Sequence, residues 1–245
     1  MNKVIYTAIF GGYDDVVEPT FKPDGWDFVC FTDTDLKSDF WEIRKVLPLY
    51  KDSTRNARRY KVLPHHWFPK HEISCWIDGN AQVRNDINEL LDYIQDCHFA
   101  TFDHSQCHLD PRGCVYDEAN AIISAGNRNT QNRPNEVPFD NPFHHYQDDP
   151  NLILNQMKKY QSDNYPSKHG LLSSMVLLRR HNENDCVKVM EDWWTEIKYG
   201  SKRDQLSFNY SAWKNDFKFN YFKGDVRNNK HFLHMGRHKK KRVKN

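Results

Sequence analysis

Three features are scarce in this 245-residue sequence, and each absence argues against a class of protein. No stretch approaches the ~20 consecutive apolar residues of a membrane-spanning helix, so we expect no such span. The six cysteines form no Cys-x-x-Cys pair, which argues against a disulfide framework and a paired zinc knuckle. The net charge is only +2, which argues against a surface adapted to nucleic acid. The short apolar N-terminus is typical of a first strand rather than a signal peptide, so we expect a soluble, cytoplasmic protein.

Length and composition predict a single domain over residues 1–245. A chain of this length can bury a substantial core without disulfides or metals. Hydrophobic residues make up 38% of the sequence and aromatic residues 14%, so large rings supply much of that core. Residues 127–150 are rich in Asn, Pro, Asp and His and lack periodicity, which predicts a long loop or insertion. Residues 239–245 form a basic tail.

Short apolar runs alternate with helical patterns along the chain. The runs that predict buried strands span residues 4–10, 28–31, 73–77, 99–102 and 171–178. Helical spacing of apolar residues occurs at 86–97 and 183–199, and a helix is expected to begin near Arg55. This alternation predicts an α/β fold with a mostly parallel central sheet flanked by helices.

The most informative stretch is residues 76–83, Trp-Ile-Asp-Gly-Asn-Ala-Gln-Val. An apolar run that ends in a carboxylate predicts a strand delivering Asp78 to the sheet edge where ligands of α/β proteins bind. Asp78 and Asn80 offer the hard oxygen ligands that Mg²⁺ and Mn²⁺ prefer, and such a cation can hold a diphosphate. Asp-Gly-Asn is also ordinary chemistry for a turn after a strand. The spacing resembles the Asp-x-Asp-x-x-Val stretch of nucleotide-sugar-dependent glycosyltransferases.

A sugar nucleotide presents a base, a ribose, a diphosphate and a sugar, and the sequence offers candidate partners for each. Arg55, Arg58 and Arg59 share one face of the predicted helix, and guanidinium groups bind phosphate oxygens well. Lys61 follows in the same basic stretch, for which a solvated surface is the alternative. The candidates for base and ribose lie near the ends of the first two predicted strands and are Thr7, Tyr13 and Asp33.

Two motifs in the C-terminal half could complete such a site. His234, followed by Lys239, could close a metal site and place a cation against phosphate, or these residues could begin the basic tail. Arg203-Asp204-Gln205 opens a predicted aromatic-rich helix that extends to Trp213. Its Asp204 could hold substrate hydroxyls or could cap the helix.

Residues 104–118 carry His, Cys and polar groups at high density. His104 and His108 fit no closed four-ligand zinc spacing. The candidates for an acceptor site are His104, Arg112 and Tyr116. Glu118 could serve as a base, and ordinary surface positions are the alternative for all of these residues.

Five blocks of sequence, in order, resemble one family. They are Tyr-Thr-Ala-Ile-Phe-Gly-Gly-Tyr-Asp from Tyr6, Cys-Phe-Thr-Asp from Cys30, Tyr-Lys-Val-Leu-Pro-His from Tyr60, Trp-Ile-Asp-Gly-Asn from Trp76 and Arg-Asp-Gln-Leu-Ser-Phe from Arg203. With residues 104–118, they resemble the glycosyltransferase-like domain of plant mucilage and turgor-regulation proteins and of bacterial polysaccharide clusters. The resemblance covers nearly the whole chain apart from residues 127–150.

That family is itself similar to glycosyltransferase family 8. The resemblance implies a GT-A fold with a Rossmann-like nucleotide-binding half and a nucleotide-sugar donor, with a UDP-sugar favoured. It implies Asp78, Asn80 and His234 as ligands of Mn²⁺ or Mg²⁺. It also implies Lys239 beside the phosphate and Asp204-Gln205 beside the transferred sugar. Asn80 departs from the second Asp of the pattern, and the spacing from His234 to Lys239 is one residue shorter than His-x-x-Gly-x-x-Lys.

We therefore expect a glycosyltransferase that moves a sugar from a nucleotide-sugar to a glycan or lipid-linked acceptor in surface polysaccharide synthesis. Glu118 as a base would suit inversion of the anomeric centre, and Asp204 beside that centre would suit retention. The basic tail is expected to hold the enzyme at anionic lipid on the inner face of the membrane. Two other classes stay open: a metal-dependent hydrolase of a lipid amide, with Zn²⁺ at His104 and His108, and a non-catalytic glycan-binding module.

Overall fold

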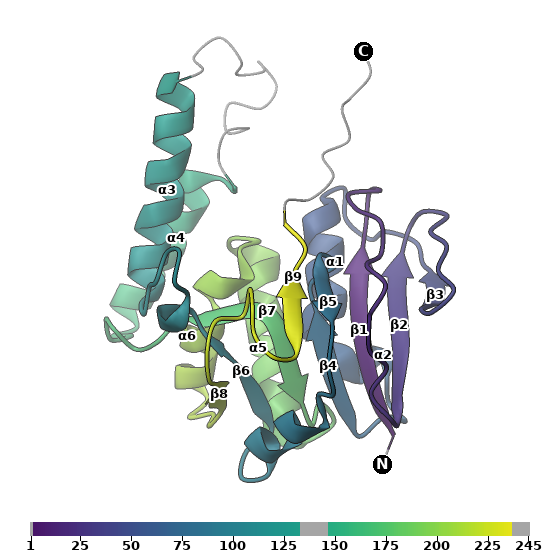
Figure 1. Cartoon of the computed structure of the whole chain (residues 1–245). Coiled ribbons are helices and arrows are strands. Elements are labelled where there is room, and N and C mark those ends of the chain that lie inside the picture. Colours follow the sequence, from purple (N-terminus) through teal and green to yellow (C-terminus); the bar gives the residue numbers. More distant parts are fainter. Residues whose placement is uncertain (1, 133–146, 237–245) are drawn as a thin grey trace.

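The computed structural model describes residues 2–132 and 147–236, and its centre is a seven-stranded sheet (Figure 1). The strands are β1 (Lys3–Ile9), β2 (Trp26–Thr32), β3 (Glu42–Lys45), β4 (Ile73–Ile77), β6 (Phe99–Asp103), β7 (Leu172–Arg179) and β8 (Asn220–Phe222). Their order in the sheet is β3-β2-β1-β4-β7-β6-β8. A smaller sheet pairs β5 (Ala81–Val83) with β9 (Phe232–His234).

The described residues form the α-helices α1 (Ser53–Val62), α2 (Pro64–Trp67), α3 (Val115–Asn132), α4 (Pro150–Ser162), α5 (Asn184–Tyr199) and α6 (Phe208–Lys214). Helices α1, α5 and α6 pack against the sheet, and α3 and α4 pack against each other. The described residues also form 3₁₀ helices, namely η1 (Asn88–Ile94), η2 (His104–Gln106) and η4 (Asp204–Leu206). Within the described ranges, no helix combines the length and the apolar character that a bilayer crossing requires. Helices α3 and α4 stand together at one side of the molecule (Figure 1).

The direction of the strands brings four strand ends to one edge of the sheet. β1 runs parallel to β2 and β4, and β2 runs parallel to β3. β7 is antiparallel to both β4 and β6, while β6 is parallel to β8. The carboxyl ends of β1, β4 and β6 therefore meet the amino end of β7. The expected α/β class and the mostly parallel sheet are confirmed, with β7 as the strand that reverses direction.

Both faces of the central strands are buried, which explains their continuous apolar runs. Along β1, Val4, Tyr6 and Ala8 pack toward α1, α5 and α6, whereas Ile5 and Ile9 pack toward η1 and the β5–β9 sheet. A third cluster joins α3, α4 and α6. The sheet is thus held between two layers, and the α3–α4 pair has a small core of its own.

Two expectations for local structure were wrong. Instead of the α-helix expected over 86–97, residues 88–94 form the 3₁₀ helix η1, and the Asp86 carboxylate accepts a hydrogen bond from the Asn88 N–H at its start. Residues 127–132 are the last turns of α3 rather than a loop. A helix satisfies its own backbone hydrogen bonds, so it can continue through polar residues without an apolar face. The rest of the expected loop, residues 133–146, lies outside the described residues.

Candidate functional site

Asp78 directly follows β4 and lies where the strand ends converge. Its backbone N–H donates to the Met175 carbonyl of β7 at 2.9 Å, and the Ala81 N–H donates back to the Asp78 carbonyl at 2.8 Å. The turn crosses β1 closely, because a Cβ atom on Gly79 would lie 3.1 Å from Cγ1 of Ile9. Glycine at this position therefore allows the turn to approach the end of β1.

A buried chain of charges holds the Asp78 carboxylate. Lys61 Nζ lies 3.1 Å from Asp78 Oδ1 and 2.7 Å from Asp204 Oδ2. Arg58 Nε lies 3.3 Å from Asp204 Oδ1, and the Trp76 indole N–H donates to Asp78 Oδ1 at 2.8 Å. Lys61 is fully buried and Asp204 is 1% exposed. Asp78 is therefore oriented by groups from α1, β4 and η4.

The Asp204 side chain pairs with Arg58 and Lys61 and does not cap a helix. Burial opposes its ionisation, but Arg58 and Lys61 outweigh burial and hold the pKa of Asp204 well below its usual range. The N-cap residue of η4 is Arg203, and its side chain makes no capping hydrogen bond. The carboxylate of Asp204 is thus a fixed anion behind Asp78.

Two cavities, each of about 620 Å³, share Asp78 and Arg203 in their walls. The one that we name the β1–α1 cavity lies at the end of β1 and the start of α1, and its lining includes Phe10, Tyr13, Ser53, Thr54, Arg58, Trp76 and Gly79. The one that we name the β7–α3 cavity lies between the sheet edge and α3, and its lining includes Asn80, His104, Arg112, Glu118, Ser173, Ser174, Gln205, Arg227 and His234.

Asp78, Asn80 and His234 all line the β7–α3 cavity. Pairing of Ala81 with His234 in the β5–β9 sheet brings His234 beside the Asp78 turn. The Asn80 amide nitrogen lies 2.9 Å from Nε2 of His234 and donates to the Gly236 carbonyl at 3.1 Å. A carboxylate, an amide oxygen and an imidazole from one wall form a donor set that fits Mn²⁺ or Mg²⁺.

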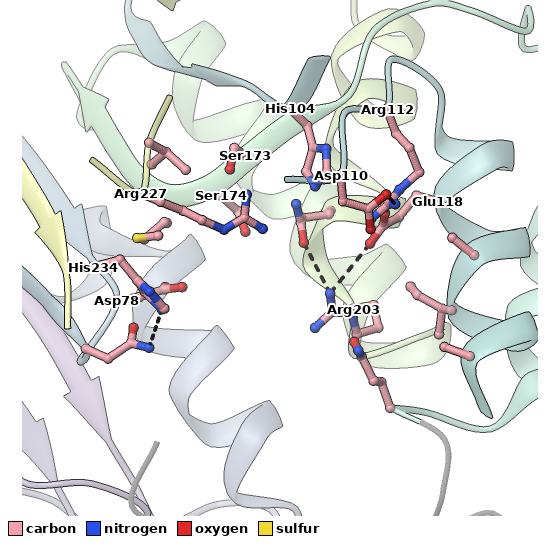
Figure 2. Close-up of a pocket in the computed structure, with 18 of the residues that line it drawn as sticks. Asp78, His104, Asp110, Arg112, Glu118, Ser173, Ser174, Arg203, Arg227 and His234 are labelled. Atoms are coloured by element: carbon pink, nitrogen blue, oxygen red, sulfur yellow. Dashed lines mark hydrogen bonds and ion pairs between the residues drawn. The ribbon is translucent and has the colours of Figure 1, made fainter. Parts of the chain in front are cut away.

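Charged residues on the opposite wall of this cavity are paired with one another (Figure 2). Arg112 Nε lies 2.5 Å from Glu118 Oε2, and Arg112 also contacts Asp110. Arg203 Nη2 lies 3.6 Å from Glu118 Oε1 and donates to Gln205 Oε1 at 3.2 Å. Glu118 is only 2% exposed, and each of its carboxylate oxygens faces an arginine.

Several residues predicted to bind the donor have structural partners instead. Arg55 donates to the carbonyls of Ile197 and Gly200 at the end of α5, and the Arg59 guanidinium lies 4.6 Å from the Trp67 ring centroid. Neither arginine lines a cavity described above. The helical face predicted for them is real, but the α5 terminus and an aromatic ring occupy their side chains.

The other predicted residues divide in the same way. Thr7 is 1% exposed, and Asp33 accepts the Gly11 N–H at 2.8 Å, so both lie behind the β1–α1 cavity while Tyr13 lines it. Tyr116 donates to the Tyr165 carbonyl at 3.0 Å and packs within the α3–α4 core. Lys239 lies outside the described residues.

Sequence analysis missed Arg203, Arg227, Ser173 and Ser174 as lining residues. Arg203 stands beside the predicted Asp204-Gln205 pair, which is a usable signal. The serines sit inside the apolar run that predicted β7, and only its antiparallel direction brings their end of the strand to the site. Arg227 lies in the segment before β9, for which the sequence predicted neither a secondary-structure element nor a functional motif.

The zinc site at His104 and His108, which the sequence left open only as an alternative, is not seen among the described residues. His108 binds the Asp225 carboxylate through Nδ1, and His104 is 4% exposed in the cavity wall. Among residues 2–132 and 147–236, the group of three potential ligands found close together is His65, His66 and Glu191, which includes neither His104 nor His108.

Comparison with known proteins identifies the family of the chain. Residues 1–238 match the family described as TOD1/MUCI70, glycosyltransferase-like domain. The chain belongs to this family. The resemblance predicted from its sequence blocks is thereby confirmed. "Probable hexosyltransferase MUCI70" of Arabidopsis thaliana is 28% identical to it over an alignment of 229 residues that covers 84% of this chain and 36% of that relative. This TOD1/MUCI70 chain thus spans little more than a third of the length of the plant relative.

Three solved structures of glycosyltransferases show some likeness to this chain. The bifunctional glycosyltransferase WbbM has a TM-score of 0.46 and 10% identity, with 91% of this chain and 38% of that chain covered. A glycosyltransferase for the major capsid of PBCV-1 has a TM-score of 0.45 and 10% identity, covering 96% and 94%. Core-mannan synthase A of Aspergillus fumigatus, in an Mn/GDP form, has a TM-score of 0.41 and 7% identity, covering 86% and 69%.

Proposed function

We propose that this TOD1/MUCI70 domain is a glycosyltransferase of GT-A type that uses a nucleotide-sugar donor. The observation that carries the proposal is the pair of cavities that meet at Asp78. A sugar nucleotide is a bipartite ligand with a diphosphate at its centre, and the two cavities offer a bipartite site with a candidate metal ligand at their junction. The nucleoside would occupy the β1–α1 cavity and the sugar the β7–α3 cavity.

The β1–α1 cavity has the chemistry that a nucleoside diphosphate requires. Phe10, Tyr13 and Trp76 offer rings beside a base, and UDP is the nucleotide that we favour. Ser53 and Thr54 lie in the first turn of α1 and offer hydroxyl groups to the diphosphate, whereas the Asp52 carboxylate already accepts the N–H groups of Thr54 and Arg55. Arg58, Lys202 and Arg203 line the same cavity and supply cations, and Lys202 Nζ lies 2.7 Å from Oδ2 of Asp52 at the start of α1. In this proposal, Arg58 replaces Arg55 and Arg59 as the arginine at the diphosphate.

Asp78, Asn80 and His234 would hold Mn²⁺ or Mg²⁺ at the junction. When bound, such an ion neutralises charge on the leaving diphosphate. The chain's own contribution is orientation, because Lys61 and Trp76 both bind Asp78 Oδ1 and restrict its rotation. Asn80 is a neutral ligand, so this site carries one negative charge fewer than a site with two carboxylates.

On the sugar side, Gln205 is the member of the Asp204-Gln205 pair that lines the cavity. Asp204 is 1% exposed and bound by Lys61 and Arg58, so we assign it as a positioning residue rather than one that touches the sugar. Glu118 lines the cavity, but Arg112 and Arg203 engage its oxygens. Its action as a base toward an acceptor hydroxyl would require release from at least one of these arginines.

A thermal-shift screen of UDP, GDP, CDP and their sugars, with and without Mn²⁺, tests the proposal. A ligand that binds only the folded state raises the melting temperature. We expect one nucleotide to stabilise the protein in the presence of Mn²⁺ and to lose this effect in Asp78→Asn. The matched control is Asp24→Asn, an exposed acid outside both cavities, which should keep the effect. Absence of stabilisation by every nucleotide would refute the donor site.

The acceptor in this proposal is a glycan or a lipid-linked saccharide of surface polysaccharide synthesis, reached from the cytoplasm. The basic residues 239–245 would hold the enzyme against anionic lipid. Deletion of these residues should reduce binding to phosphatidylglycerol vesicles at low salt more than at high salt, because the attraction is electrostatic. Equal binding of the deleted and full-length chains at low salt would contradict this part of the proposal.

A further inference from the structure

Arg227 in the β7–α3 cavity lacks a carboxylate partner among the described residues. Arg227 extends into the cavity from the segment before β9 (Figure 2). Arg112 and Arg203 on the same cavity wall both lie against Glu118, but no described carboxylate lies within 4.0 Å of the Arg227 guanidinium. Its Nη1 atom is buried and has no hydrogen-bond partner among the described residues.

The nearest acid in sequence does not compensate Arg227 with an ion pair. One oxygen of Asp225 accepts the backbone N–H of His108, at 3.0 Å, and lies against the His108 ring. The other oxygen accepts the backbone N–H of Arg227 at 2.9 Å. Asp225 therefore shapes the loop that carries Arg227, while the guanidinium faces the cavity.

His104 adds a second unpartnered group to the same part of the cavity. Its side chain is 4% exposed, and Nδ1 is buried without a hydrogen-bond partner in the part of the chain that the structure describes. Burial is the main cause that lowers the pKa of His104, and the charges of Arg112 and Arg227 act in the same direction. Ser173 and Ser174 line the cavity nearby and are 6% and 5% exposed.

A buried guanidinium nitrogen and a buried imidazole nitrogen without hydrogen-bond partners are unfavourable for folding, and such atoms are expected where a ligand completes their hydrogen bonds. The ligand that satisfies a guanidinium best is an oxyanion, which can accept two parallel N–H bonds. Serine hydroxyls and the imidazole can contact the remaining oxygens or neighbouring hydroxyls of a sugar.

We propose that Arg227, His104 and Ser174 form a subsite for an anionic substituent, so that the sugar in the β7–α3 cavity carries a carboxylate or a phosphate. This inference rests on the proposed function only in assigning that cavity to a sugar. We place the subsite apart from the diphosphate because Arg227 lines the β7–α3 cavity, whereas Arg58 lines the β1–α1 cavity.

Isothermal titration of three probes tests the subsite directly. Methyl glucuronide, glucose 6-phosphate and methyl glucoside are titrated into the full chain, first alone and then with UDP and Mn²⁺ present. We expect one of the two anionic probes to bind at least about tenfold more tightly than the neutral glucoside, because a charge-assisted hydrogen bond replaces a neutral one. The preferred probe identifies the anion as a carboxylate or a phosphate. Equal binding of all three probes would overturn the inference.

Variants then locate the effect. Arg227→Gln should remove the preference for the anionic probe, and Arg227→Lys should retain part of it. The matched control is Arg128→Gln, which removes the same charge from an exposed position at the same cavity. A loss equal to that of Arg227→Gln would indicate a general field rather than a built subsite, and would refute the proposal.

A titration with UDP and Mn²⁺ alone separates this inference from the proposed function. UDP affinity should be unchanged in Arg227→Gln if the guanidinium binds the sugar, and a tenfold loss would place Arg227 at the diphosphate and overturn the subsite. Failure of UDP to bind the unmodified chain would refute the donor site, while anionic-probe binding lost in Arg227→Gln would still support the subsite.

Discussion

The two cavities that meet at Asp78 have equal volumes of about 620 Å³, but they differ in how completely the buried polar groups around them are paired. Behind Asp78, Lys61, Asp204 and Arg58 are bound to one another and are largely removed from solvent. Across the β7–α3 cavity, Arg227 and His104 have buried nitrogens without partners. The difference separates two uses of buried charge: paired groups position a functional side chain, and unpaired groups can receive a ligand.

The largest effect is expected when the cation of the buried ion pairs, Lys61, is removed. Lys61→Met leaves Asp204 buried with Arg58 as its remaining partner, and we expect the free energy of unfolding to fall by about 3–5 kcal/mol. Urea denaturation measures this loss.

Arg227→Met is the matched control for that experiment, because it also replaces a cation with a methionine but breaks no ion pair between described residues. We expect Arg227→Met to leave the free energy of unfolding unchanged or slightly raised. A double variant, Lys61→Met with Asp204→Leu, should recover part of the loss because it leaves no buried anion. Equal losses for Lys61→Met and Arg227→Met would erase the distinction between the two cavities.

The pH dependence of stability tests the same idea in the core. His181 Nε2 lies 3.0 Å from the Phe68 carbonyl, its Nδ1 is buried without a partner among the described residues, and burial lowers the pKa of His181 to about 4. Between that value and the ordinary pKa of 6.5, the unfolded state binds more protons. Stability therefore falls with decreasing pH, by about 2 kcal/mol from pH 7 to pH 5 for this group.

Urea denaturation at pH 7 and pH 5 measures this slope, with His181→Asn as the comparison. We expect the variant to be less sensitive to pH, although it is less stable at pH 7. His65 and His104 act in the same direction, because burial lowers the pKa of each. Identical pH slopes for the variant and the unmodified protein would show that His181 is protonated in the folded state.

Local sequence patterns predicted where the longer strands lie better than they predicted the direction of each strand in the sheet. The runs at 4–10 and 73–77 are apolar on both faces, so β1 and β4 were recognisable. The antiparallel direction of β7 left no trace in its run, because a strand buried on both faces looks the same in either direction. The short strands β5, β8 and β9 were missed, since three residues carry too little periodicity to predict a strand.

The substitution Asn80→Asp tests whether residue 80 binds a metal ion at the junction between the two cavities. The Asn80 amide nitrogen donates to the Gly236 carbonyl and contacts His234, and a carboxylate there loses both donors. We expect a small loss of stability without metal, about 1 kcal/mol, and about tenfold tighter binding of Mn²⁺ because the site gains a charge. Calorimetric titration of Mn²⁺ in the presence of UDP provides the measurement, and unchanged Mn²⁺ affinity would remove Asn80 from the metal site.

The smallest effect concerns two arginines on one helix. Arg55→Gln loses hydrogen bonds to the carbonyls at the end of α5, so we expect about 1 kcal/mol less stability with unchanged UDP affinity. Arg58→Gln should weaken UDP binding instead, because Arg58 lines the β1–α1 cavity. Titration of UDP into both variants tests this separation, and a loss of UDP affinity in Arg55→Gln would return that residue to the donor site.

The sequence by itself determined which residues could be buried and which turn would carry a carboxylate. The apolar run before Asp78 specifies a strand, and strand ends in such sheets are where ligands bind. Tertiary structure decided the partners: it placed His234 beside Asn80 through the β5–β9 sheet, bound Arg55 to α5 and left Arg227 facing a cavity. The physical reason is that residue type and spacing set local conformation and burial, whereas pairing between charges depends on contacts between segments far apart in the chain.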